Sequence, residues 1–315
     1  MKYIQNQIAE SRQTLPTTMV YSAVVWLLAG MIQEGWWMIQ FPLFLISAFL
    51  MMQLNNVNLL IRIYSQMISG TFVMLSCAAA FLFPSVTGGF VQFCFIVSIL
   101  SLFNTYQELP VIGWLYYAFL FLSLASLVEV RILLYLPLFW LLMLVTIHAR
   151  GWRAIMASVL GILTPYWFML AWLLYSQRQE FDYNQLISHF GELSAVTLSD
   201  FAIDDLQRLL TLTVVIILGI VGGIHFIMKH YEDKFRVRQL YYSFIYLALY
   251  TFALMFVIPS QFDMLLRILI IAASPLIGHF FALTKTKVSN IFFLVTAGII
   301  LILTIFNLWS SSSIF

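Results

Sequence analysis

Five charged side chains stand at the edges of long apolar runs, where they could act together on a phosphate group. Glu34, Glu129 and Asp263 are acids, and Arg131 and Arg267 are permanently charged cations. A guanidinium binds phosphate or carboxylate through two parallel hydrogen bonds, and a carboxylate beside the bound group can serve as a general base. These residue types favour transfer or polymerisation of a phosphate-bearing substrate, with the acids as catalytic candidates and the arginines as substrate-binding candidates.

Two tryptophans extend this set, because Trp36 and Trp37 follow Glu34 after a single glycine. Trp is enriched where a membrane meets water, so we expect the pair to anchor this loop at headgroup depth. In that position the two rings are also substrate-binding candidates beside Glu34.

Spacing decides which of the charges can meet. Asp263 and Arg267 are four residues apart and share one face of a helix. Glu129 and Arg131 are two residues apart and would diverge on a helix, so a contact between them requires a turn. Two possibilities remain for these four charges. They simply reach water or lipid headgroups, or they join Glu34 around one outward-facing cleft.

No pattern in the chain predicts a metal ion or another cofactor. The five histidines lie at no ligand spacing such as H-E-x-x-H, and we expect His148, His230 and His279 at inner membrane edges. Motifs of the G-x-S-x-G and Walker types are also missing from the sequence. Cys77 and Cys94 lie inside apolar runs, so they predict no disulfide framework.

Composition places all of this chemistry in a membrane. The chain has 315 residues, of which 63% are hydrophobic and 9% charged, and its mean hydropathy is +0.97. Soluble domains are roughly half apolar and about a quarter charged. We therefore predict one all-α membrane domain over residues 1–315, a polytopic bundle of transmembrane helices, and no basic block suggests nucleic acid as a partner.

Apolar runs of nearly twenty residues recur along the whole chain, as expected for membrane-spanning helices. Eleven spans are predicted, at 15–33, 38–54, 64–83, 89–105, 110–128, 132–148, 154–175, 208–228, 241–258, 263–283 and 290–309.

Residues 110–148 pose the main topological choice, because they are apolar except for Glu129 and Arg131. A single helix of this length would extend about 58 Å, against a hydrocarbon core of about 30 Å. Two helices joined by a turn at the charged residues fit the membrane better. We predict a helical hairpin whose tip carries both charges.

The distribution of basic residues supports this hairpin and orients the chain. With eleven spans, a cytoplasmic N-terminus and an outer C-terminus, the inner side receives eleven of the fifteen Lys and Arg residues: Lys2, Arg12, Arg62, Arg150, Arg153, Lys229, Lys234, Arg236, Arg238, Lys285 and Lys287. This bias agrees with the positive-inside rule, and a single span over 110–148 would remove it. The basic inner loops are expected to attract anionic membrane lipids.

Residues 176–207 are the one sizeable segment predicted outside the membrane. Leu186, Ile187, Phe190 and Leu193 recur at helical spacing, which predicts short amphipathic helices on the outer membrane surface. About thirty residues are too few for an independent soluble domain, but they could bind a membrane-protein partner.

Two weaker patterns concern packing and symmetry. Gly219, Gly222 and Gly223 are spaced for close packing of their span against a neighbour. Glu34 and Glu129 each precede a Pro-Leu-Phe triplet by eight residues, which would fit either a parallel repeat or coincidence in so biased a sequence.

Over residues 12–175 the chain resembles a little-characterised family of bacterial inner-membrane proteins of about 300 residues. The likeness lies in "SILSLFNTYQELP" and in "ASLVEVRILLYLPLFWLLMLVTIHARGWRAIMASVLGILTPYW", above all in Arg150, Trp152 and Arg153 followed by Gly161 and Pro165. The resemblance implies a multi-pass protein of the bacterial inner membrane and transfers no catalytic residue.

A weaker resemblance links the outer acids and arginines to polytopic envelope enzymes that use polyprenyl-phosphate-linked sugars. It implies a glycosyltransferase-like protein acting on a lipid-linked glycan at the outer membrane edge. Two alternatives stay open, namely a non-catalytic membrane subunit or scaffold, and a transporter of a small solute or ion.

Overall fold

The computed structural model describes residues 3–30, 37–106, 111–176 and 206–312, and these residues contain no β-strand. They form twelve α-helices: α1 (Ile4–Glu10), α2 (Thr14–Leu28), α3 (Trp37–Asn58), α4 (Met67–Ala78), α5 (Val86–Asn104), α6 (Val111–Val128), α7 (Leu136–Val145), α8 (Trp152–Ser176), α10 (Leu206–Lys229), α11 (Phe235–Val257), α12 (Phe262–Leu283) and α13 (Lys287–Ser312). Four short 3-10 segments lie at their ends: η1 (Ala80–Leu82), η2 (Val130–Tyr135), η3 (His230–Glu232) and η4 (Pro259–Gln261).

Seven helices in the described residues are long and apolar enough to cross a membrane. They are α3, α5, α8, α10, α11, α12 and α13. Shorter apolar helices occupy Thr14–Leu28, Met67–Ala78, Ile112–Val128 and Val130–Val145. An all-α, polytopic membrane protein is therefore confirmed. A helix lies at each of the eleven segments that hydropathy selected, while the predicted amphipathic helices of 176–207 fall almost wholly outside the described residues.

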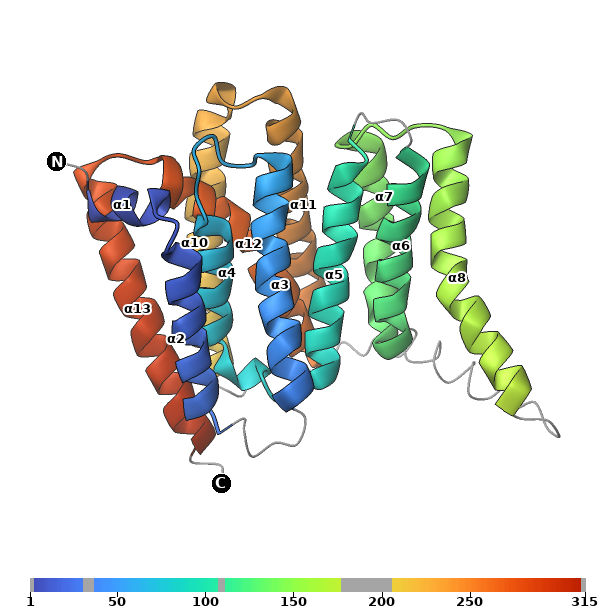
Figure 1. Cartoon of the computed structure of the whole chain (residues 1–315), viewed down its shortest axis with the longest axis horizontal. Helices are drawn as coiled ribbons and strands as arrows, with labels where there is room; N and C mark the ends of the chain where they lie inside the picture. The colour runs from blue at the N-terminus through green and yellow to red at the C-terminus, as the bar shows by residue number, and fades with distance from the viewer. Residues whose placement is uncertain (1–2, 31–36, 107–110, 177–205, 313–315) are drawn as a thin grey trace.

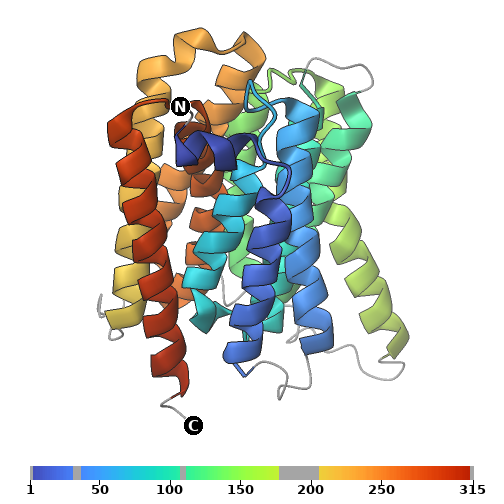
Figure 2. The same cartoon turned by 60° about the vertical axis from the view of Figure 1, so that its left-hand side comes forward.

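The long helices stand side by side, and α1 lies across one end of the bundle (Figures 1 and 2). The connections around residues 59–66, 146–151, 230–234 and 284–286 gather at this same end, called here the α1 end (Figure 1). The other end holds η1, η2 and η4 and is called the hairpin end. Helix α13 ends at the hairpin end, opposite α1 (Figure 1). The four connections at the α1 end are all among those predicted for the inner side.

The hairpin predicted between residues 110 and 148 is present. Glu129 has an extended backbone, with φ −134° and ψ 95°, and it separates α6 from η2 and α7. The rings of Phe119 and Phe139, ten residues on either side of Glu129, lie 6.2 Å apart. A continuous helix would place these residues about 30 Å apart, so the chain reverses direction at Glu129.

Helix α12 is the centre of the bundle, and nearly every one of its side chains is buried. It packs against α4, α5, α10 and α11. Its side chains therefore face protein on all sides rather than along one amphipathic stripe. Small residues make this possible, as a Cβ added to Gly278 would lie 3.1 Å from the Cα of Ile68 in α4.

The predicted close packing of the span with Gly219, Gly222 and Gly223 is confirmed. A Cβ on Gly222 would lie 2.6 Å from the carbonyl oxygen of Leu276 in α12, whereas a Cβ on Gly223 would meet no heavy atom within 4 Å. The two neighbouring glycines therefore differ completely in their tolerance of a side chain.

This difference gives a direct test of the α10–α12 contact. Gly222→Ala should lower the free energy of unfolding by roughly 1–3 kcal/mol, because overpacking forces the two backbones apart. Gly223→Ala should be neutral or stabilising by up to about 1 kcal/mol, because alanine favours the helix. Thermal unfolding of the two variants in the same detergent measures the contrast, and equal effects would contradict the packing described above.

Candidate functional site

Arg267 is the buried cation at the hairpin end of the bundle. It lies five residues into α12 and its side chain is only 7% exposed. Its Nη1 donates to Oε1 of Gln92 in α5 at 3.1 Å, and its Nη2 donates to the carbonyl oxygen of Leu82 in η1. These two bonds hold the guanidinium plane against the start of α5.

The start of α5 is shaped to receive this guanidinium. Ser85 caps the helix by accepting a hydrogen bond from the Gly88 N–H at 3.0 Å. A Cβ on Gly88 would lie 2.7 Å from Nε of Arg267, so only glycine admits the side chain at this distance. The N-terminus of a helix is its positive end, so α5 adds to the positive potential around Arg267.

A small polar cavity lies beside Arg267. Its volume is about 30 Å³, which is room for about two water molecules. Side chains from six elements or their edges surround it: Trp26, Gln40, Phe44, Ser47, Ser76, Leu82, Phe83, Ser85, Gly89, Gln92, Arg267 and Ile270. The name "Arg267 pocket" is used below for this cavity and its lining.

The Arg267 pocket carries a positive charge, and no acidic side chain of the described residues lines it. Asp263, one turn earlier on α12, is paired instead with Arg208 of α10, at 3.0 Å between Oδ2 and Nη2. Burying a charge without an opposite charge is costly, so such a site favours an anionic ligand. Arginine is also the side chain best suited to phosphate and carboxylate groups.

The structure brings only part of the predicted constellation together. Arg267 lines the pocket, whereas Asp263 turns to Arg208 and does not. Glu129 and Arg131 are half-buried at the hairpin tip and are not lining residues. Trp37 begins α3 and is half-buried outside the lining. Glu34 and Trp36 lie outside the described residues.

Sequence reasoning missed the neutral polar residues of the pocket. Gln40 and Gln92 stand inside predicted spans, and their amides are only 4% and 5% exposed. An amide in an apolar run was the available signal, because a polar group at membrane depth needs a partner inside the protein. Trp26 carried no such signal, since a tryptophan in a span is common.

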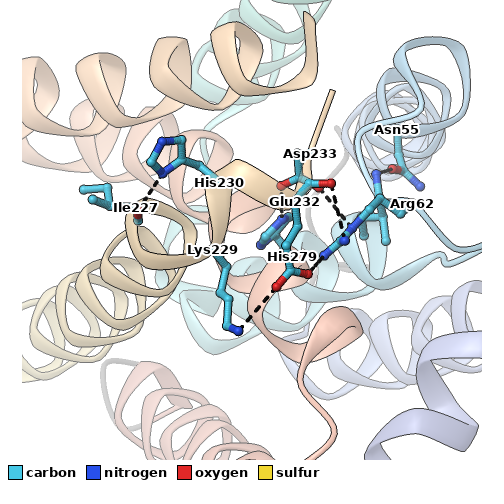
Figure 3. Close-up of polar contacts among 9 residues, drawn as sticks. Asn55, Arg62, Ile227, Lys229, His230, Glu232, Asp233 and His279 are labelled. Atoms are coloured by element: carbon cyan, nitrogen blue, oxygen red, sulfur yellow. Dashed lines mark hydrogen bonds and ion pairs between the residues drawn. The ribbon is translucent and has the colours of Figure 1, made fainter. Parts of the chain in front are cut away.

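A second buried polar cluster lies at the α1 end (Figure 3). Nε2 of His279, near the end of α12, lies 3.1 Å from Oδ2 of Asp233, and both side chains are fully buried. Nε of Arg62 lies 3.1 Å from the other carboxylate oxygen of Asp233. Glu232 bridges Arg62, at 2.8 Å, and Lys229, at 3.3 Å, nearer to the surface.

This cluster ties three separate parts of the chain to one another. Arg62 belongs to the connection between α3 and α4, Asp233 follows η3, and His279 belongs to α12. His279 was expected at an inner membrane edge, and the structure adds that it is fully buried and paired. The sequence did not single out Asp233, because an acid inside a basic loop looks like an ordinary surface residue.

Removal of one member of the Asp233–His279 pair should be strongly destabilising. We expect Asp233→Leu and His279→Phe each to lower the free energy of unfolding by roughly 3–5 kcal/mol, because each leaves a buried polar partner without its counterpart. The double variant should lose less than the sum, with a coupling of about 0.5–3 kcal/mol. Unfolding in detergent measures all three.

The matched control for this cycle is Glu232→Gln, whose ion pairs are exposed to solvent. Its effect should be small beside that of either buried substitution, as for surface salt bridges in general. Additive effects of the two buried substitutions would show that Asp233 and His279 do not depend on each other.

Comparison with known proteins provides no relative for this chain. It matches no protein-family model, no curated protein and no solved structure. The resemblances drawn from its motifs remain predictions. The function must therefore be argued from the geometry of the Arg267 pocket.

Proposed function

We propose that this chain is a multi-pass protein of the bacterial inner membrane that binds the phosphate group of a lipid in the Arg267 pocket. The lipid is a lipid-linked glycan or a phospholipid-like molecule, and it is bound at the outer edge of the membrane. The proposal includes eleven spans, with the N-terminus in the cytoplasm and the C-terminus outside. One observation carries it, namely a buried arginine whose pocket is lined by no carboxylate of the described residues.

Charge balance supports an anion as the ligand. Two N–H groups of Arg267 are used by Gln92 and Leu82 in the described part of the chain, and both acceptors are neutral. Neutral acceptors satisfy hydrogen bonds but do not compensate the positive charge. Asp263, whose carboxylate acts on this charge through space, is paired with Arg208. A phosphate oxygen beside the guanidinium would supply that charge through strong, charge-assisted bonds.

Depth in the membrane supports a lipid as the source of the phosphate. Arg267 lies five residues from the start of α12, or about 8 Å along the helix axis. An ionisable group near the end of a membrane-spanning helix is at the level that lipid headgroups occupy. A lipid phosphate reaches this level from within the membrane, without having to leave it.

The proposal is limited to binding. Transfer chemistry requires a carboxylate base near the bound phosphate, and neither Glu129 nor Asp263 lines the pocket. The roles of these acids as catalytic groups stay predictions from the sequence. The scaffold and transporter alternatives have no contact in the described residues that favours them over binding.

Lipid binding by the purified protein tests the proposal. In native mass spectrometry we expect the wild type to bind dioleoylphosphatidylglycerol and undecaprenyl phosphate in preference to zwitterionic dioleoylphosphatidylcholine. Arg267→Gln should weaken binding of both anionic lipids by about ten- to a hundredfold, since bonds to charged groups contribute most to such contacts. Arg267→Lys should weaken it less, because lysine keeps the charge but loses the planar fork.

Two controls make the result specific. Arg208→Gln removes a half-exposed cation at the same end of the molecule, and it should leave binding within about twofold of the wild type, as expected for a charge that solvent partly screens. Inorganic phosphate at the same concentration distinguishes a free anion from a lipid. Unchanged lipid binding by a folded Arg267→Gln protein would refute the proposal, and so would competition by inorganic phosphate alone.

The proposed topology has its own test in single-cysteine labelling. Ser260, in η4 at the hairpin end, and Lys287, at the α1 end, are both exposed, and the native Cys77 and Cys94 are buried. In intact spheroplasts a membrane-impermeant maleimide should label Ser260→Cys, and it should label Lys287→Cys only after lysis. The reverse pattern, or labelling of both from outside, would contradict the orientation.

A further inference from the structure

Two polar atoms in the Arg267 pocket have no hydrogen-bond partner among the described residues. They are Nε1 of Trp26 and Oε1 of Gln40. Trp26 is 6% exposed and Gln40 is 4% exposed, so neither atom is satisfied by bulk water. A buried polar group in a native protein is normally paired, and each exception calls for a missing partner.

The orientation of Gln40 makes its free atom an acceptor. Its Nε2 donates to the carbonyl oxygen of Pro84 at 2.6 Å. A carbonyl oxygen can only accept, so the amide nitrogen must be the atom on that side and Oε1 the atom that remains. Gln40 therefore offers the cavity an acceptor that requires a hydrogen donor from the ligand.

Trp26 offers the opposite function from a rigidly held ring. The indole stacks on Phe83 with ring centroids 4.4 Å apart, and it meets the edge of Phe41 at 5.5 Å. An indole nitrogen donates and never accepts. Together with the remaining N–H groups of Arg267, it makes one part of the cavity a donor site.

Among the other polar groups around the cavity, the Ser76 hydroxyl and Nε2 of Gln92 also make no hydrogen bond within the described residues. The remaining groups have partners. Ser47 donates to the carbonyl oxygen of Leu43 at 2.7 Å, and Ser85 accepts from Gly88 at 3.0 Å. Gln92 accepts from Arg267. The fully buried atoms without a partner therefore require an acceptor for Trp26 and a donor for Gln40, and the charge of Arg267 requires a negative acceptor.

We propose that the Arg267 pocket recognises a phosphate that has a hydroxyl group beside it, as in glycerol or sugar phosphodiesters. Arg267 and Trp26 bind an anionic phosphate oxygen, and Gln40 accepts a hydrogen bond from the neighbouring hydroxyl. A cavity of about 30 Å³ has room for one oxygen of the phosphate and for the oxygen of the hydroxyl, and the rest of the headgroup stays outside it. This inference rests on the proposed function and names the chemical class of its ligand.

Two lipids of equal charge isolate the hydroxyl requirement. Dioleoylphosphatidylglycerol and dioleoylphosphatidylmethanol are both phosphodiesters with one negative charge, but only the first has headgroup hydroxyls. Native mass spectrometry with the full-length wild type should show about tenfold preference for phosphatidylglycerol, the gain expected from one buried hydrogen bond. Soluble glycerol 3-phosphate is added as a competitor in a parallel experiment. It should not displace the bound lipid if a lipid is the source of the phosphate.

Three variants assign the preference to individual atoms. Gln40→Met keeps the volume of the side chain and should reduce the preference to about unity, as expected for loss of that one bond. Trp26→Phe should weaken both lipids to a similar extent and leave the preference intact. Gln13→Met, at an exposed position near the α1 end, is the matched control and should change nothing. Lipid binding is compared only for variants whose thermal unfolding midpoint equals that of the wild type.

The outcomes separate this inference from the function on which it rests. Equal binding of both lipids by the wild type, with loss of both in Arg267→Gln, would overturn the hydroxyl requirement and leave the anion site standing. Trp26 and Gln40 would then hold water. Binding of neither lipid would instead overturn the proposed function itself. Retained preference in a folded Gln40→Met protein would exclude Gln40 as the group that reads the hydroxyl.

Discussion

The enclosure of α12 is the constraint on which the rest of the structure depends. This mostly apolar helix is surrounded by α4, α5, α10 and α11, and its neighbours approach it closely. Gly222 and Gly278 allow this approach at two crossings, where any side chain would meet backbone atoms. Inside a membrane, such contact is stabilised by close van der Waals packing rather than by exclusion of water.

A central helix in this position imposes one condition: each polar group that it carries must have its partner inside the protein. Arg267 and His279 are twelve residues apart on α12, or about 18 Å, and neither has free access to bulk water. The two ends meet the condition differently. His279 has a carboxylate from Asp233, backed by Arg62, whereas the acceptors that Arg267 meets in the described residues are neutral. The first end is electrostatically complete and suits a structural role, while the second has no carboxylate in direct contact among the described residues and suits binding.

Local pattern was a reliable guide to the elements of this fold. The hairpin at Glu129 followed from two lengths, the rise of a helix and the thickness of a membrane, and the contact between Phe119 and Phe139 agrees with it. The close packing of α10 on a neighbour followed from the spacing of Gly219 and Gly222, and the structure identifies that neighbour as α12. The side-chain partners were harder to predict from the sequence. Helical spacing predicts Arg267 as the partner of Asp263, but Asp263 pairs with Arg208. The guanidinium of Arg267 instead donates to Gln92 in α5 and to Leu82.

The sequence by itself determined that this protein is a polytopic helical membrane protein and where its helices lie, because hydropathy and helix length are local properties. It also selected Arg267 as a candidate phosphate ligand, since a cation in an apolar run is conspicuous. Only the tertiary structure decided that Trp26, Gln40 and Gln92 surround it and that the predicted acids do not line its pocket. The reason is physical: which atoms meet depends on the rotation and the neighbours of each helix, and these are set by packing between segments far apart in the chain.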